Sequence, residues 1–220
     1  MKSLIFTSGL QGKIELEILN LLNQQKDFLS VMTAGSTRAT GDAIQTIIEE
    51  KFENILGDLS EDYSAKFARR AMADLAFKDK RGNYYVVDVK THREETAFNM
   101  PNLTSVDRLA RFYEDDANFF VVLMVKYSVT ETKATVSRVH FFPIEHLAWD
   151  CLTIGALGIG QIQIANSRNI IIDAKKTRRA WMLELCDCVL QFYPREIVKI
   201  GKRVARFEKV KEFWLAKKDD

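Results

Sequence analysis

One stretch of the chain limits its fold more than any other: an unbroken apolar run from Phe119 to Val125. Because this run does not alternate with polar residues, it is typical of a central strand that is buried on both faces of its sheet. Helices must then cover the sheet. We therefore predict an α/β fold with a mixed central β-sheet flanked by helices, and we place the buried strand at residues 118–128.

The rest of the chain alternates between helical and extended patterns. Asp42 is a suitable N-cap after a polar loop at 33–41, and Gly57 is a suitable end for the helix that follows. A helical tail begins at Thr177 and is predicted to break near Pro194. The predicted helices are 10–30, 42–56, 60–71, 103–114 and 143–147, and the other predicted strands are 72–77, 84–90 and 134–142.

Two of the predicted strands form a hairpin that brings acidic residues together. If Lys78 pairs with Tyr84 across the turn sequence 79–83, then Asp74 pairs with Asp88. Directly opposed residues share one face of a sheet, with Cβ atoms about 4.5–5.5 Å apart. Lys90 lies two residues after Asp88 and shares that face. A register shift of one residue would move one carboxylate to the other face.

Such a pair of carboxylates favours a metal site. The two charges repel each other, so a fold keeps them mainly when a cation lies between them. Mg²⁺ binds carboxylate oxygens and water, and the backbone carbonyl of Val89 is a further candidate ligand. Bound Mg²⁺ polarises a phosphoryl group and lowers the pKa of a coordinated water. Lys90 would orient that water and stabilise charge in the transition state, so Asp74, Asp88 and Lys90 predict phosphodiester hydrolysis.

These residues resemble a known motif. Asp74, thirteen intervening residues and then Asp88-Val89-Lys90 are similar to the active-site motif of the PD-(D/E)xK nuclease superfamily. With Thr91 added, the motif is close to the form seen in several type II restriction endonucleases. The resemblance implies a restriction-endonuclease-like core, Mg²⁺-dependent cleavage of double-stranded DNA, and a homodimer that cuts a palindromic site. One departure is Met72-Ala73, which stands where Pro often precedes the first Asp.

Many members of that superfamily also place a Glu on the preceding helix. The candidates in the helix 42–56 are Gln45, Glu49, Glu50 and Glu53, and the sequence does not choose among them. Because Glu49 is one turn from Gln45 on the same face, both are candidate catalytic residues. We expect a single nuclease domain over residues 1–220, with a catalytic core at about 40–145 and elements for DNA recognition and dimerisation at about 146–220.

Polar residues outside the motif are candidates for contact with DNA. Gln161 and Gln163 alternate with isoleucines, so one face of a predicted strand carries amides, which can bind adenine. The alternative for each of these residues is that it is an ordinary polar residue on the surface, exposed to water. The candidate set is Arg38, Thr91, His92, Arg93, Asn99, Gln161, Gln163, Asn166, Arg168, Asn169, Lys175 and Lys176.

The composition limits the partners. The net charge is only +2, but residues 175–220 contain thirteen Lys and Arg against seven Asp and Glu, which permits contact with phosphate. No apolar run approaches the ~20 residues of a membrane span, so we expect no membrane partner and a cytoplasmic protein. The resemblance to restriction endonucleases implies that its source is a bacterium or archaeon. The glycines at 155–160 lack the Lys-Ser/Thr of a P-loop, so we expect no nucleotide cofactor.

Two other functions remain open at this stage. A DNA repair or recombination nuclease with the same core, such as a junction resolvase, would select a branched structure instead of a sequence. A DNA-binding module that kept the fold without catalysis would bind DNA and not cut it. The presence of Asp74, Asp88 and Lys90 together favours an enzyme over such a module.

Overall fold

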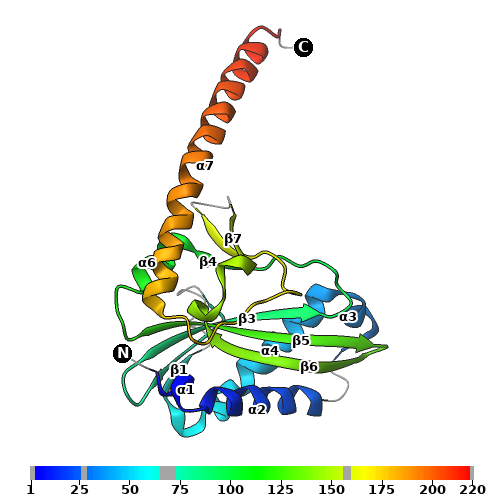
Figure 1. Ribbon diagram of the computed structural model, residues 1–220. Coiled ribbons are helices and arrows are strands. Elements are labelled where there is room, and N and C mark those ends of the chain that lie inside the picture. The colour runs from blue at the N-terminus through cyan, green and yellow to red at the C-terminus, as the bar shows by residue number, and fades with distance from the viewer. Residues whose placement is uncertain (1–2, 26–28, 65–72, 156–159, 219–220) are drawn as a thin grey trace.

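A computed structural model describes residues 3–25, 29–64, 73–155 and 160–218. Within these residues the main sheet has five strands in the order β1-β2-β3-β5-β6 (Figure 1). β3 and β5 are parallel and the other neighbours are antiparallel, so the predicted α/β class with a mixed central sheet is confirmed. The strands are β1 (Ser60–Ser64), β2 (Leu75–Asp79), β3 (Tyr84–Arg93), β5 (Asn118–Thr130) and β6 (Lys133–Pro143).

Each face of this sheet carries its own hydrophobic core. On one face lie α1 (Leu4–Thr7), α2 (Leu10–Gln24) and α4 (Thr37–Leu56). On the other lie α6 (Val106–Phe112), the start of α7 (Arg178–Leu215) and a small sheet of β4 (Asn102–Ser105), β8 (Gln161–Ile164) and β7 (Leu152–Gly155). Alternate residues of β5 enter the two cores, Val121 and Leu123 on one side and Phe120 and Val122 on the other. The strand at 118–128 is therefore buried on both faces, as predicted.

The helix predicted at 42–56 begins earlier than predicted. Residues 33–41 are not a loop: they form the end of α3 (Val31–Gly35) and the first turn of α4. Ser36, and not Asp42, is the N-cap, because its hydroxyl accepts a hydrogen bond from the Ala39 N–H at 3.2 Å. The helix ends before Gly57 as predicted, where a positive φ of 48° suits glycine.

Other boundaries also differ. The helix predicted at 60–71 is wrong for residues 60–64, which form β1 and pair with β2, and 65–72 lie outside the described residues. Residues 102–105 form β4, so the helix predicted at 103–114 is shorter. The described part of the helix predicted at 10–30 ends at Gln24, and residues 26–28 lie outside the description. The described part of the first hairpin strand begins at Leu75.

The C-terminal helix does not break at Pro194. α7 is one helix from Arg178 to Leu215, and Figure 1 shows it leaving the rest of the molecule and extending far beyond it. Proline provides no N–H for the helix. Beside it, the Arg195 side chain donates from Nε to the Gln191 carbonyl at 3.0 Å, a bond within this turn of the helix. No helix in the described part of the chain has a segment long and apolar enough to cross a membrane.

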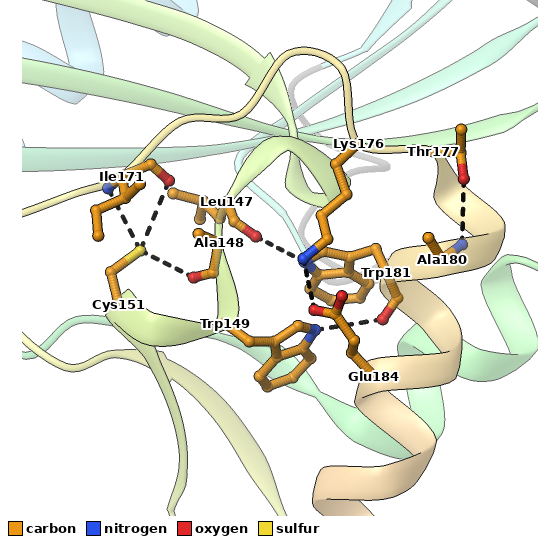
Figure 2. Close-up of polar contacts among 10 residues, drawn as sticks. All are labelled: Leu147, Ala148, Trp149, Cys151, Ile171, Lys176, Thr177, Ala180, Trp181 and Glu184. Carbon is orange, nitrogen blue, oxygen red and sulfur yellow. Dashed lines mark hydrogen bonds and ion pairs between the residues drawn. The ribbon is translucent and has the colours of Figure 1, made fainter.

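The start of α7 is fixed to the body by two tryptophans (Figure 2). Trp181 is fully buried, and its indole N–H donates to the Leu147 carbonyl at 2.8 Å. The ring of Trp149 lies 4.9 Å from that of Trp181, and its indole N–H donates to the Trp181 carbonyl at 3.2 Å. An ion pair of 2.5 Å between Lys176 and Glu184 adds a further link. The direction in which α7 leaves the body is therefore set by packed, hydrogen-bonded contacts.

Candidate active site

The hairpin of β2 and β3 has the register that the sequence predicts. Lys78 pairs with Tyr84, and Leu75 pairs with Val87. Asp74 lies one residue before β2, and its N–H donates to the Val87 carbonyl at 3.0 Å. The strand pairing ends at Leu75, so Asp74 lies beside Val87 at the end of the hairpin and is not itself paired with Asp88.

Asp88 and Lys90 form a buried ion pair on one face of β3. Lys90 Nζ lies 2.7 Å from Asp88 Oδ1, and the two side chains are 19% and 6% exposed. The other oxygen, Oδ2 of Asp88, is buried and accepts no hydrogen bond from the described residues. Burial raises the pKa of Asp88 to about 7; the charge of Lys90 opposes this rise and the charge of Asp74 adds to it. A buried carboxylate with one unpartnered oxygen is unusual, because such groups are normally satisfied.

Asp74 binds the edge of β3 beyond the end of β2. Its Oδ2 accepts from the Val89 N–H at 2.7 Å, where β2 has ended and offers no backbone partner. The N–H and C=O of one strand residue point to the same edge, so the Val89 carbonyl lies on the Asp74 side. Burial raises the pKa of Asp74, an effect that the Val89 N–H and Lys90 oppose.

α4 supplies the amide that orients Asp74. Gln45 Nε2 donates to Asp74 Oδ1 and to Glu49 Oε1, both at 2.8 Å. Of the four candidates on this helix, Gln45 and Glu49 are thus brought to Asp74, whereas Glu50 and Glu53 are exposed. The tight approach of Gly41 to β3, where an added Cβ would lie 2.6 Å from Thr91 Oγ1, holds the helix against the strand.

The donor set suits a hard cation with few protein ligands. The described residues contain no cluster of three or more His, Cys, Asp or Glu side chains that could hold a metal ion. Mg²⁺, however, commonly binds through one or two carboxylates and keeps several waters. Asp74, the unpartnered Oδ2 of Asp88 and the Val89 carbonyl are oxygen ligands of this kind. The residues present therefore fit Mg²⁺ and do not fit a structural zinc site.

Two of the residues that follow Lys90 have structural partners. His92 is 1% exposed, and its Nδ1 lies 2.8 Å from the hydroxyl of Ser167. The prediction that His92 contacts DNA directly is therefore wrong, because the imidazole ring is buried and cannot reach DNA. Arg93 donates to the Ala34 carbonyl at 2.9 Å and pairs with Glu95, so it connects β3 to α3.

Only part of β8, the strand that carries Gln161 and Gln163, is available for contact with DNA. Its apolar face is confirmed, since Ile162 and Ile164 are fully buried. Gln163 is nearly buried too, and its amide donates to Asn102 Oδ1 at 2.6 Å, so this side chain is used within the small sheet. Gln161 keeps partial exposure.

Distant segments meet at the carboxyl end of β3. The Ser167 N–H donates to the Asn99 carbonyl at 2.8 Å, and Asn166 bonds the Ala97 carbonyl at 3.3 Å. Arg168 and Asn169 are exposed beside them. At the start of α4, which contacts the same end of β3, Arg38 is 93% exposed. Several candidate DNA contacts are thus brought to one end of the sheet.

Lys175 and Lys176 lie elsewhere. They line a cavity of about 420 Å³ with Phe119 and Glu145, at the opposite end of β5. Lys176 is already paired with Glu184, and Arg178, next but one in sequence, is paired with Glu145 at 3.0 Å. These residues are not brought to Asp88.

Sequence reasoning missed the role of Ser167. This residue is fully buried, and its hydroxyl lies 2.8 Å from Nδ1 of His92. It has no local pattern that would have identified it. No model of a known protein family matches the sequence, and a comparison with curated proteins found no match.

Proposed function

We propose that this protein is a Mg²⁺-dependent endonuclease that hydrolyses phosphodiester bonds in double-stranded DNA. Its core would be of the restriction-endonuclease type, and its role that of a type II restriction enzyme that cuts a palindromic site as a homodimer. One observation carries the proposal: Asp88 and Lys90 form a buried pair on β3, and the Asp74 carboxylate binds the N–H of the residue between them.

Each residue would have a distinct part in the reaction. Asp74, Asp88 and the Val89 carbonyl would hold Mg²⁺, which when bound supplies a Lewis acid for the phosphoryl group and a more acidic water. The Lys90 ammonium lies beside these ligands, where it would orient the attacking water and stabilise the growing negative charge. Gln45 keeps the Asp74 carboxylate in place through its hydrogen bond.

Supercoiled and linear plasmid DNA with Mg²⁺ provides the test. Asp88→Asn and Lys90→Ala should each lower cleavage by at least 100-fold, because each removes a group that contacts the metal or the charge that develops. Lys78→Ala is the matched control, since Lys78 is exposed on the neighbouring strand of the same hairpin. It should cleave like the wild type.

The products separate the possible functions. Discrete fragments support a restriction enzyme, and run-off sequencing of their ends then gives the site. Preferential cutting of four-way junctions would indicate a resolvase-like nuclease. Binding of DNA in Ca²⁺ without any cleavage in Mg²⁺, or full activity of Asp88→Asn, would refute the proposed chemistry.

A further inference from the structure

The projecting part of α7 carries a repeat that the body of the protein does not use. Two rows of apolar residues recur every seven positions, the second row three residues after the first. This is the spacing of positions a and d in a coiled coil. Apart from Tyr193, which packs partly on the body, all of these residues are more than half exposed. The a positions are Leu183, Leu190, Ile197 and Val204, and the d positions are Tyr193, Ile200, Phe207 and Trp214.

Exposure on this scale calls for a partner. Single apolar residues on a surface need no explanation, but a continuous row on one helix face marks an interaction site. From Leu190 to Trp214 the row extends for about 36 Å at 1.5 Å per residue. The buried Trp181 and its bond to Leu147 fix the base of the helix, so the row is presented in a defined direction (Figure 2).

We propose that α7 pairs with α7 of a second copy of this chain in an antiparallel two-stranded coiled coil. One register aligns the whole row: Leu190 faces Phe207, Tyr193 faces Val204, and Ile197 faces Ile200 of the other copy. In two of these layers a large side chain meets a smaller one, Phe207 with Leu190 and Tyr193 with Val204. The interface between the two helices is therefore filled evenly.

The same register extends to both ends of the row. Leu183, exposed at the base of the helix, faces Trp214 of the second copy, and Cys186 faces Lys211. The ammonium of Lys211 would then lie near the exposed Asp187. Every large apolar residue of the two rows is thereby covered.

The charge distribution favours the antiparallel direction over the parallel one. Residues 199–218 contain eight Lys and Arg and only two Glu, whereas residues 178–196 contain three Arg and three acidic residues. A parallel pair would place the two basic halves side by side and Lys211 against Lys211 in the seam, which is repulsive. An antiparallel pair places each basic half beside a neutral one.

The pairing does not depend on the nuclease proposal. Its surface lies on the projecting helix, and none of the residues of the rows contacts Asp74, Asp88 or Lys90. It would give the assembly two-fold symmetry, the symmetry of the homodimer in the proposed function.

Sedimentation equilibrium of the full-length protein tests the partner. The wild type should have the mass of two chains at micromolar concentration. Ile197→Asp should be a monomer, because it places a charge in the seam, while Val198→Asp, at a position of similar exposure just outside the seam, should remain a dimer. Phe207→Asp, farther from the body, should repeat the result of Ile197→Asp. A monomeric or larger wild type, a dimeric Ile197→Asp, or a monomeric Val198→Asp would overturn the proposal.

Disulfide formation between proteins with one accessible cysteine tests the direction, since the remaining Cys151 is buried. With Cys186 and Cys188 replaced by Ser, Leu190→Cys and Phe207→Cys are prepared separately and mixed under mild oxidation. The antiparallel register predicts a mixed cross-linked dimer. It predicts no cross-link in Leu190→Cys alone, because residues 190 of the two copies would lie about 26 Å apart along the axis. Self-linking of Leu190→Cys without mixed product would overturn the antiparallel arrangement.

Discussion

Two buried aspartates of the same hairpin should respond to Asn substitution with opposite signs. Asp79 lies in the turn, where its carboxylate accepts four hydrogen bonds: from the N–H groups of Arg81 and Asn83, the Asn83 amide and the Tyr85 hydroxyl. Asp88 has one ion pair with Lys90 and one buried oxygen without a partner. Both oxygens of Asp79 therefore have hydrogen-bond partners in the fold, whereas Oδ2 of Asp88 has none among the described residues.

The pKa values give the size and sign of each effect. Burial alone would raise the pKa of Asp79, but its hydrogen bonds outweigh burial and lower it. Loss of charge-assisted bonds in Asp79→Asn should therefore cost about 2–3 kcal/mol in the free energy of unfolding. The pKa of Asp88 is raised to about 7. At about 1.4 kcal/mol per pH unit, ionised Asp88 would destabilise the fold by up to about 4 kcal/mol above pH 7.

The two substitutions should also differ in their dependence on pH. A carboxyl whose pKa is raised on folding stabilises the fold fully below its unfolded pKa, and this contribution is lost as pH rises through about 7. Asp88→Asn should therefore be about 1–4 kcal/mol more stable than the wild type at pH 8 and gain less than half as much at pH 5. A lowered pKa works in the opposite direction, so the cost of Asp79→Asn should be similar at pH 5 and 8 and shrink only below about pH 4.

Urea unfolding in EDTA, followed by tryptophan fluorescence at pH 5 and pH 8, measures all of these differences. The reasoning is refuted if Asp88→Asn is less stable than the wild type at pH 8, or if its effect is the same at both pH values. A stable but inactive Asp88→Asn would mean that this carboxylate is retained at a cost to the fold.

The remaining predictions concern the two faces of the sheet. Gly41→Ala should destabilise the wild type, because the added Cβ would clash with the Thr91 hydroxyl. In a Thr91→Ala background this clash is absent, and the better helix propensity of Ala should raise the free energy of unfolding by about 1 kcal/mol. Urea unfolding of the wild type, the two single variants and the double variant measures this. Trp181→Phe leaves the buried Leu147 carbonyl without its donor and should lower the free energy of unfolding by about 1–3 kcal/mol. Gln45→Leu should reduce cleavage about 10–100-fold, whereas Lys51→Leu on the same helix should not.

The core of the candidate site was predictable because it depends on local rules. The turn at 79–83 fixes the hairpin register, and a strand has a side-chain period of two, so the sequence places Asp74, Asp88 and Lys90 together. The supporting residues were not predictable in this way. Gln45 was one of four candidates, and the packing of α4 on the sheet, with Gly41 close to Thr91, brings it to Asp74.

Local rules failed where distant contacts decided the outcome. Polar residues at 33–41 predicted a loop, but Ser36 caps a helix there and Tyr127 donates to the Thr37 carbonyl at 3.2 Å. His92 has the sequence context of a strand exit, yet a segment 75 residues away covers it. Pro194 predicted a break in a helix that continues to Leu215.

The sequence by itself determined the mixed α/β sheet, the hairpin register and the placement of Asp88 and Lys90 on one face of their strand, because periodicity and turn chemistry act over a few residues. Tertiary structure decided which of these polar groups lost water and which found partners. Burial depends on segments far apart in the chain, and it is burial that leaves Asp88 Oδ2 without a hydrogen bond, covers His92 and leaves the apolar rows of α7 exposed.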